Sequence, residues 1–583
     1  MQFSDPRRDV VRDHLMATSR VPPLTASNSS TDKFSTTMRQ PIIFDGRSTP
    51  VKTALFIILC AAWILPGLIG HDPWKTESTT FGIIYAMLQG GSWLFPAVAG
   101  IPNNDYPPLY YWVAAAMAKI FSPILPLHDG ARLATALFIA ITLTYTNKTA
   151  KRLFDERAGR ISVVLLIGSL GIFVRGHEMN PEVAGLAGFA VALYGMTRIR
   201  SETTKGGITT GVGTGIVAMS IGILPALVIP AVAVALVWML GEWKNRLFQR
   251  GIGVALLTAL PFMVVYPASL LMLGAIGPSI WTNAILGAPL LNESTRGSIN
   301  PIYFIRILPW YGLPALPLAV WLWWKDRRKI RERFELALPF VSSMVLLMWW
   351  SFFREANDAV GLALLPPLVL AAAGVLDRLS RSVASFMDWF SLLFFGLLVT
   401  TIWLYWTAAI VGVPEAAANN MARQVPGFAF TFGWLPFCVA LALTLVWVYA
   451  LVRAHRNSRR AVVNWAAGIT VVWVLFNMLG LSALNHRSSY RSTAATLRAQ
   501  LPETRKCVAE INLGEPQRAM LDYFAQLRFV PTESSTTTAC DWLLTQGSKE
   551  SGPKVDSVWQ LSWEGSRPGD NSERFRLYRR VGS

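Results

Sequence analysis

Residues 71–112 read HDPWKTESTTFGIIYAMLQGGSWLFPAVAGIPNNDYPPLYYW, and this stretch decides how the rest of the chain is interpreted. It follows a long apolar run and places three carboxylates, those of Asp72, Glu77 and Asp105, beside a predicted membrane span. Partial desolvation at the boundary between water and hydrocarbon makes a carboxylate more basic, and therefore a better proton acceptor. The segment PPLYYW at 107–112 adds aromatic side chains, which favour the headgroup layer. The stretch predicts an acidic loop at a membrane boundary, suited to chemistry.

Composition predicts a polytopic membrane protein. Of the 583 residues, 52% are hydrophobic and 15% are charged, which leaves too much apolar surface for one water-soluble core. The formal net charge of +18 would favour nucleic-acid binding in a soluble protein, but here Lys and Arg cluster in short segments between apolar runs. The charge is therefore a topology signal, and we expect no nucleic-acid partner.

The apolar runs predict roughly thirteen transmembrane helices, since each span needs about twenty mainly apolar residues. Lys and Arg are concentrated in alternate loops, which places the N-terminus in the cytoplasm and the first long loop, residues 71–129, outside. We therefore expect a mainly α-helical, multi-pass protein. The predicted spans are residues 52–70, 130–150, 160–174, 182–198, 207–223, 225–241, 251–273, 304–324, 335–353, 359–376, 387–412, 433–452 and 462–482.

The sequence divides into three predicted parts. Residues 1–50 are polar, lack the order of a signal peptide and are expected to form a disordered cytoplasmic tail. Residues 51–483 form the transmembrane part. Residues 484–583 mix short β-rich runs with the helical stretch EPQRAMLDYFAQL, which predicts a small α/β domain on the outer side. Cys507 and Cys540 both belong to this domain, and an oxidising compartment favours a disulfide between them.

Four segments carry a resemblance to a known family. The acidic motif after the first span, GSWLFP from Gly91, DYPPLYYW from Asp105 and ARLATALF at 131–138 together resemble the membrane glycosyltransferases of the GT-C type. The match is closest to bacterial relatives of the protein O-mannosyltransferases and the lipid A aminoarabinose transferase. This resemblance implies a location in the bacterial cytoplasmic (inner) membrane with a periplasmic C-terminal domain. It also implies interfacial helices and acidic catalytic residues in the first outer loop, and a sugar donor carried on a polyprenyl phosphate.

The resemblance also assigns roles by position. Glu77 matches the acidic residue of the family's D-E-A-R-Y-like motif and Asp72 matches the acid before it, so both are candidate catalytic bases. Asp105 takes the place of Glu in the family's F-E-K-P-P, as a third catalytic candidate that positions the acceptor or a metal. Tyr106 replaces the Lys of that motif, and Tyr106 and Tyr110 are taken as substrate-binding.

The lysine that Tyr106 replaces is the one that relatives are expected to use on the lipid phosphate, so another outer-side cation must take its place. Glu182 matches an acidic residue near the start of the family's fourth span, and His177 is expected to point into the same cavity as Glu77. The candidates for the phosphate partner are Arg175, His177, Arg296, Arg306 and Arg354.

The chemistry of such a transfer can be stated from first principles. Displacing a phosphate-linked sugar needs a nucleophile stripped of its proton, an acceptor held in line and positive charge for the departing phosphate. A single displacement inverts the anomeric centre. The sequence has no P-loop, which fits a donor without a nucleotide, and no Cys-x-x-Cys or His-x-x-x-His spacing typical of a metal site. No cofactor is assured by the sequence, and a divalent metal between Asp105 and Glu77 stays open.

Alternatives remain at the level of residues and of function. Asp72 could cap a helix, Asp105 could serve the turn PNNDYPP, and Glu77, His177 and Arg354 could be structural. The expected partners are the lipid-linked sugar, membrane lipids and an acceptor, which is lipid A, another glycolipid or a protein. A glycan ligase or polymerase with a polyprenyl-diphosphate donor, and a non-enzymatic transporter or lipid flippase, are the alternative functions. Because the acidic residues gather at outer ends and not at mid-membrane, the enzyme is favoured over the transporter.

Overall fold

The structure is a computed structural model in which residues 1–39 and 40–583 form two separate units. All described residues belong to the second unit. The predicted tail, apart from Pro50, and the phosphate-partner candidate Arg296 lie outside them. The described residues are 50–74, 76–103, 105–273, 285–287, 300–453, 458–503, 507–532, 540–570 and 572–581.

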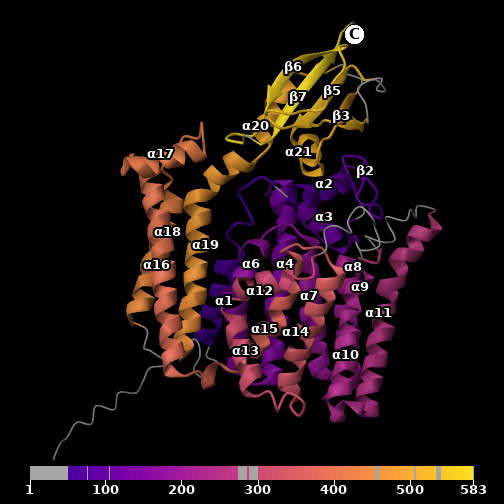
Figure 1. Cartoon of the computed structure of the whole chain (residues 1–583), viewed down its shortest axis with the longest axis vertical. Helices are drawn as coiled ribbons and strands as arrows, with labels where there is room; N and C mark the ends of the chain where they lie inside the picture. The colour runs from indigo at the N-terminus through magenta and orange to yellow at the C-terminus, as the bar shows by residue number, and fades with distance from the viewer. Residues whose placement is uncertain are drawn as a thin grey trace, which may run out of the picture. The chain divides into compact units, whose positions relative to one another are not determined.

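The described part is mainly α-helical, as the sequence predicts, and a helix overlaps each range that was expected to span the membrane (Figure 1). The match includes the short and broken ranges, where two helices share one predicted span. These helices are α1 (Pro50–Ile64), α4 (Leu127–Leu153), α5 (Glu156–Ile167), α6 (Leu170–Arg175), α7 (Pro181–Ile199), α8 (Thr203–Ile221), α9 (Ile223–Ala226), α10 (Val228–Met239), α11 (Arg246–Met272), α12 (Tyr303–Tyr311), α13 (Ala315–Lys325), α14 (Phe334–Phe353), α15 (Leu365–Ala373), α16 (Arg381–Val411), α18 (Trp434–Arg453) and α19 (Ser458–Ser488).

Length and hydropathy alone select fewer of these helices as membrane-crossing. Five helices of the described part pass that test, and the count rises to six if α12 and α13, which meet at 103°, form one broken span. Helix α4 illustrates why others do not pass, because its 27 residues carry Asp129 and Arg132 near the start and Lys148 near the end. Such charges lower the mean hydropathy of a helix even where its middle is apolar.

Helices α7 and α8 pack closely because glycines line their contact. A Cβ atom added to Gly195 would lie 2.4 Å from the backbone nitrogen of Thr210, and one added to Gly213 would lie 2.5 Å from that of Ala192. Only a residue without a side chain allows the two backbones to approach this far, as in the small-residue interfaces of membrane helices. The close contact buries most of α7, which carries Glu182 at its start.

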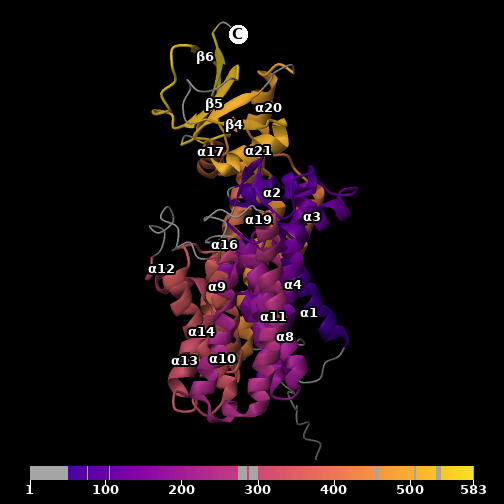
Figure 2. The same ribbon diagram turned by 90° about the vertical axis from the view of Figure 1, so that its right-hand side faces the viewer.

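The first outer loop contains two helices, as expected, together with a short hairpin. They are α2 (Thr76–Leu88), β1 (Ala97–Val98), β2 (Ile101–Pro102) and α3 (Leu109–Phe121). Helix α2 packs against α21 (Glu515–Ala525) of the C-terminal region (Figure 2). Gly82 of α2 permits this contact, since a Cβ at that position would lie 2.5 Å from the Cβ of Ala519. Around it, the ring of Tyr523 meets Phe81 and Tyr85 at centroid distances of 4.8 and 5.0 Å.

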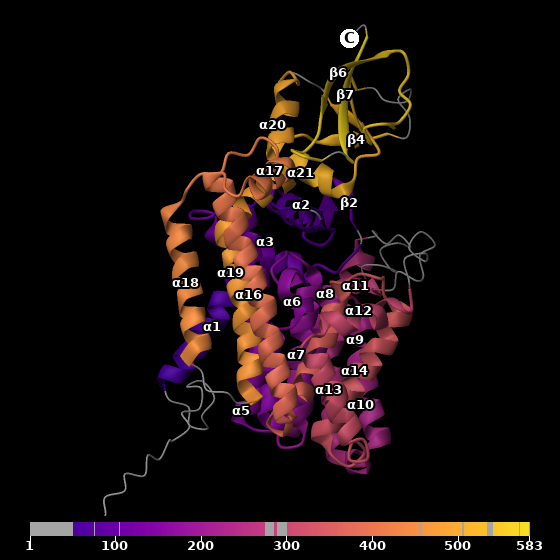
Figure 3. The ribbon, with the colours of Figure 1, turned by 60° about the vertical axis from the view of Figure 1, so that its left-hand side comes forward.

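The C-terminal residues form a mixed sheet with two helices, which agrees with the α/β pattern of the sequence. The two helices are α20 (Arg491–Ala499), which follows α19, and α21 (Figure 3). A further helix outside this region, α17 (Glu415–Gln424), lies between α16 and α18 in the sequence. The strands are β3 (Val508–Ile511), β4 (Phe529–Pro531), β5 (Trp542–Gly547), β6 (Trp559–Gly565) and β7 (Arg574–Arg580), in the order β4-β3-β5-β7-β6. Strand β3 runs parallel to both of its neighbours, while the pairs that β7 forms with β5 and β6 are antiparallel.

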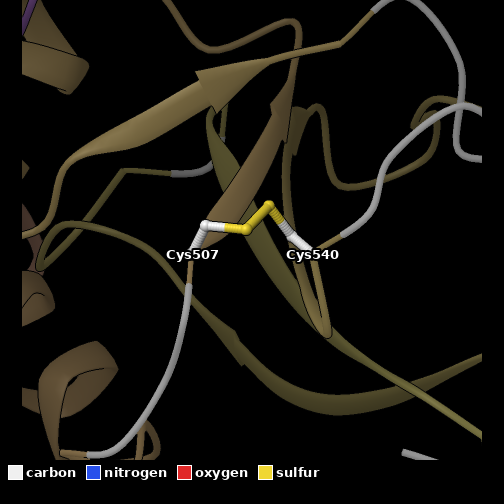
Figure 4. Close-up of a disulfide and its surroundings, with 2 residues drawn as sticks. All are labelled: Cys507 and Cys540. Atoms are coloured by element: carbon white, nitrogen blue, oxygen red, sulfur yellow. A yellow bond between two sulfur atoms is a disulfide. The ribbon is translucent and has the colours of Figure 1, made fainter.

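A disulfide joins Cys507 and Cys540, the pair that the sequence suggests (Figure 4). The two cysteines lie just before β3 and β5, so the bond ties the starts of two adjacent parallel strands across 33 residues of sequence. The free cysteines of the described part are Cys60 in α1 and Cys438 in α18.

We predict that the double substitution C507S/C540S lowers the free energy of unfolding of the C-terminal sheet by about 2–4 kcal/mol, because the unfolded chain regains the freedom of a long closed loop. Hydrogen exchange measured by mass spectrometry should show faster exchange in β3 and β5. The substitution C438S, at an exposed free cysteine, is the control and should leave exchange unchanged. Equal protection in the double variant and the wild type would contradict the prediction.

Candidate functional site

Arg132, in the second turn of α4, is fully buried and connects the first outer loop to the helices. Its Nε donates to Glu77 Oε1 (2.7 Å) and its Nη2 to Glu77 Oε2 (3.2 Å). Its Nη1 donates to Asp129 Oδ1 (2.7 Å) and to the carbonyl oxygen of His71 (2.9 Å). The same guanidinium therefore fixes the end of the first span, the start of α2 and the start of α4.

Glu77 is held inside this network. Its Oε1 also accepts the backbone N–H of Met179 (3.1 Å), so both carboxylate oxygens have buried donors. Burial alone would raise the pKa of Glu77, but the charge of Arg132, His71 and the hydrogen bonds outweigh it and hold the pKa below its usual value. Glu77 is thus an ionised, fixed carboxylate, and it does not line the polar cavity described below.

Asp72 is also engaged, and its partners come from the C-terminal region. The Nε of Arg491 donates to Asp72 Oδ2 (3.0 Å), a second Arg491 nitrogen donates to Oδ1, and Ser489 Oγ donates to Oδ2 (2.6 Å). Burial opposes ionisation of Asp72, but the bonds from Arg491 and Ser489 lower its pKa overall. The pair therefore stabilises the fold at neutral pH and loses this effect only as the pH falls through the depressed folded-state pKa.

A polar cavity of about 310 Å³ lies where the outer loops meet. It collects four of the residues predicted for the site, Asp105, Tyr106, Arg175 and Arg354, from three segments far apart in the sequence. The other lining residues are Thr79 and Thr80 of α2, Asn103, Tyr111, Met179, Asn180, Pro181, Gly287, Glu355, Asn357, Ala359, Val360, and Glu515 and Pro516 at the start of α21.

Arg354 combines burial with an unused donor. Its side chain is 6% exposed, forms an ion pair with Glu182 and donates from Nη1 to the carbonyl oxygen of Ile221 (3.3 Å). Its Nε has no acceptor among the described residues. A buried guanidinium N–H without a partner is costly, so its position in the wall of a polar cavity points to an anionic ligand.

Arg175 differs from Arg354 because it is paired with two carboxylates, whereas Arg354 is paired with one and keeps an unused Nε. Its Nη1 donates to Glu178 Oε2 (2.6 Å) and its Nε donates to Asp358 Oδ2 (3.0 Å). Asp358 in turn lies on the loop after α14 that also carries Arg354. Arg175 therefore holds two walls of the cavity together, and it contributes less net positive charge to a ligand than its position suggests.

Three carboxylates face the cavity without a cation bonded to them in the described part. Asp105 is exposed, and its Oδ2 accepts from Asn103 Nδ2 (3.2 Å), which also donates to Glu515 Oε2 (3.1 Å). Burial raises the pKa of Glu355 and of Glu515. The cavity thus offers acidic groups able to accept a proton close to an arginine able to bind an anion.

Comparison with known proteins agrees with this arrangement. Residues 105–266 match the family described as dolichyl-phosphate-mannose-protein mannosyltransferase, so the match begins at Asp105. The chain is 26% identical over 456 residues to the undecaprenyl phosphate-alpha-4-amino-4-deoxy-L-arabinose arabinosyl transferase of Pseudomonas aeruginosa strain LESB58, covering 74% of this chain and 76% of the relative. A protein of the same name from Serratia proteamaculans is 22% identical and covers 72% of this chain and 74% of the relative.

Solved structures show the same fold. The crystal structure of ArnT from Cupriavidus metallidurans bound to undecaprenyl phosphate aligns with a TM-score of 0.64 at 15% sequence identity, over 92% of this chain and 99% of that one. The apo form aligns with a TM-score of 0.63 at 15% identity, over 90% and 97%. The chain is thus similar in sequence to lipid A aminoarabinose transferases and shares the fold of one of them. This similarity agrees with the resemblance carried by the motifs in its first outer loop.

Several predicted site residues lie outside the cavity. The ring nitrogens of His177 face the carbonyl oxygens of Phe173 (2.9 Å) and Trp63 (2.8 Å), and the hydroxyl of Tyr110 bonds to Thr135 Oγ1 (2.7 Å) in the core. Glu182 reaches the site through its ion pair with Arg354, while Arg306 is exposed on α12 and does not line the cavity.

The sequence interpretation did not single out Arg132, Glu355, Arg491 or Glu515. The last two belong to the C-terminal region, and no local pattern connects them to a loop some 400 residues away. Arg132 lies within the ARLATALF motif and Glu355 follows the candidate Arg354, so position could have identified both. No group of three or more His, Cys, Asp and Glu side chains suited to a metal ion occurs in the described ranges, and a divalent metal stays an untested expectation.

We predict that R132Q lowers the stability of the protein by about 3–5 kcal/mol, because it leaves Glu77 and Asp129 buried without their cation. Thermal unfolding of the purified full-length protein in detergent should show a clearly lower midpoint. The double variant E77Q/R132Q, which removes a buried charge of each sign, should melt above R132Q. R306Q, at an exposed arginine, is the control, and a melting temperature of R132Q equal to that of R306Q would contradict the network's role.

Proposed function

We propose that the chain transfers a sugar from a polyprenyl-phosphate donor to an envelope acceptor at the polar cavity, on the outer face of the cytoplasmic membrane. The observation that carries this proposal is the buried Nε of Arg354, which has no protein acceptor in the described part and lies in a cavity that Asp105 also lines. The names of the relatives support the donor class, since they are undecaprenyl phosphate-dependent arabinosyl transferases. Lipid A, another glycolipid or a protein is the acceptor class.

The reaction needs a base, an in-line acceptor and stabilisation of the departing phosphate. The acceptor hydroxyl attacks the anomeric carbon, the bond from that carbon to the phosphate oxygen breaks, and the hydroxyl proton passes to a carboxylate. Arg354 stabilises the charge that develops on the lipid phosphate, in the manner of an oxyanion-binding group. One displacement of this kind inverts the anomeric centre.

We assign the base to Asp105 in preference to Glu77 and Asp72. All three remain candidates from the resemblance, but the last two are buried in ion pairs with Arg132 and Arg491 that would have to break before either accepted a proton. Asp105 is exposed in the cavity that Arg354 also lines. Among the described residues, its hydrogen bonds are formed with Asn103 alone. Glu77 and Asp72 then serve to position the loop that carries Asp105.

The number of membrane spans and the sides on which the loops lie belong to the same proposal. Thirteen spans with a cytoplasmic N-terminus place the loops 71–129, 175–181 and 354–358 outside, together with the C-terminal domain. Each of these regions contributes lining residues to the one polar cavity, which supports their being on the same side. The disulfide of the C-terminal sheet also suits an oxidising compartment such as the periplasm.

A monosaccharide donor is favoured over a preassembled glycan by the size of the site. A cavity of about 310 Å³ is at the small end of ligand sites, and it suits one sugar ring with its phosphate. A ligase would have to bind an oligosaccharide on a diphosphate, so donor choice separates the two enzymes.

We predict that D105N lowers sugar transfer by at least about 100-fold while the melting temperature stays that of the wild type, because general-base catalysis contributes about that much. Purified full-length protein would be assayed with undecaprenyl-phosphate-linked 4-amino-4-deoxy-L-arabinose and, separately, with a polyprenyl-diphosphate-linked oligosaccharide. E415Q, on exposed α17 away from the cavity, is the control. Full activity of D105N would move the base elsewhere, and transfer from the diphosphate donor alone would replace the proposal by the ligase.

We also predict that R354K lowers kcat/KM for the polyprenyl-phosphate donor about 10- to 100-fold, because lysine keeps the charge toward Glu182 but lacks the planar fork that reaches a phosphate. The measurement is a donor titration in the same assay, with thermal unfolding as a check on folding. A folded R354K with wild-type donor kinetics would exclude Arg354 as the phosphate partner.

A further inference from the structure

A second and larger cavity lies away from the polar site, between the first helix and the helices after the outer loop. It measures about 870 Å³ and is lined by residues of α1, the end of α3, α4 and the start of α5. Its apolar lining includes Phe56, Ile57, Leu65, Phe121 and Leu137. Since α1 contacts α4 only lightly, the space between them forms a groove, which we name the α1–α4 groove.

The polar residues of the α1–α4 groove are concentrated where α4 ends and α5 begins. Thr144, Asn147 and Lys148 come from the last third of α4, and Glu156 and Arg160 come from the start of α5. The lining near the other ends of α1 and α3 is apolar, as at Leu65 and Phe121. The groove therefore has the polarity of an amphiphile, with one polar end and a long hydrocarbon part.

The polar end carries an available positive charge. Lys148 is exposed, and its Nζ lies 4.8 Å from the centre of the Tyr145 ring. The acidic residue nearby, Glu156, is occupied by Lys151, whose Nζ lies 2.9 Å from Glu156 Oε2. The groove thus favours a negative headgroup over a neutral or positive one.

This polar end is far from the site of sugar transfer. Arg132 and Lys148 lie 16 residues apart on α4, which corresponds to about 24 Å along a helix. That distance is most of the roughly 30 Å hydrocarbon core of a bilayer, so the two ends belong to opposite leaflets. A donor whose phosphate reacts beside Arg354 cannot at the same time place that phosphate beside Lys148.

We propose that the α1–α4 groove binds an anionic phospholipid, with its phosphate beside Lys148 and its acyl chains between α1 and α4. The lipid fills the space that the light contact of α1 with α4 leaves open, and thereby supports the first span that leads into the loop of Asp72 and Glu77. The site differs from the sugar-transfer cavity in location, in leaflet and in ligand, and it does not depend on the proposed function.

Native mass spectrometry tests this site by measuring how many lipid molecules bind. The purified full-length protein is titrated in detergent with phosphatidylglycerol and, separately, with phosphatidylcholine. Wild-type protein should bind one phosphatidylglycerol in preference to phosphatidylcholine. K148Q should weaken binding of phosphatidylglycerol about fivefold, the factor that one cation near an anionic lipid surface contributes. K325Q is the matched control, because Lys325 is also an exposed lysine over an aromatic ring (4.6 Å to Trp321) but lies outside the groove.

A steric variant provides the second arm. Ala140 lines the groove on α4, so A140W should block it and abolish binding of the selected lipid, whereas A442W on the exposed face of α18 should not. Thermal unfolding identifies any variant that fails to fold. The proposal is overturned if the wild type shows no preference for phosphatidylglycerol, if K325Q weakens binding as much as K148Q, if a folded A140W binds normally, or if undecaprenyl phosphate displaces the bound phospholipid.

Discussion

The buried guanidinium of Arg132 is the interaction on which the outer part of the molecule depends. It pairs with Glu77 and Asp129 and donates a hydrogen bond to the carbonyl oxygen of His71, where the chain turns. One positive charge thus compensates two negative charges inside the protein, which is possible because backbone N–H groups of Met179 and Gly70 complete the carboxylates' hydrogen bonds. Removing Arg132 would leave two buried carboxylates without their cation, so the network fixes the relative positions of α2, α4 and the segment before α7.

That rigidity separates the three acids that the sequence predicts as catalytic candidates into two environments. Glu77 and Asp72 are both occupied by arginines in ion pairs. Asp105 follows the β1–β2 hairpin and reaches a cavity that the fixed elements surround. A carboxylate already paired with arginine is a poor proton acceptor, whereas an exposed one beside an unused guanidinium N–H is suited to the task.

The sequence predicted the helical class and the places of the helices, including those of the first outer loop, because these depend on local composition. It also predicted the pairing of Cys507 with Cys540, because the C-terminal region contains only these two cysteines. Asp105, Tyr106 and Arg354, which outer-loop position and motif singled out, line one cavity, while their roles stay predictions. The sequence could not predict that Arg132 and Arg491 would occupy Glu77 and Asp72, because the choice of ion-pair partner depends on which distant segments fold together. Glu515 was missed for the same reason, as it approaches Asn103 across 412 residues of sequence.

The C-terminal region is therefore part of the site and not an independent appendage. Arg491 binds Asp72 at the edge of the first loop, Tyr523 packs between Phe81 and Tyr85 of α2, and the start of α21 places Glu515 in the cavity wall. The contact of Tyr523 holds α21 against α2, whereas Arg491 joins the start of α20 to the loop before α2. Because the start of α21 forms part of the cavity wall, a change of sequence there would alter the shape of the proposed acceptor site, while Asp105 and Arg354 lie on other segments.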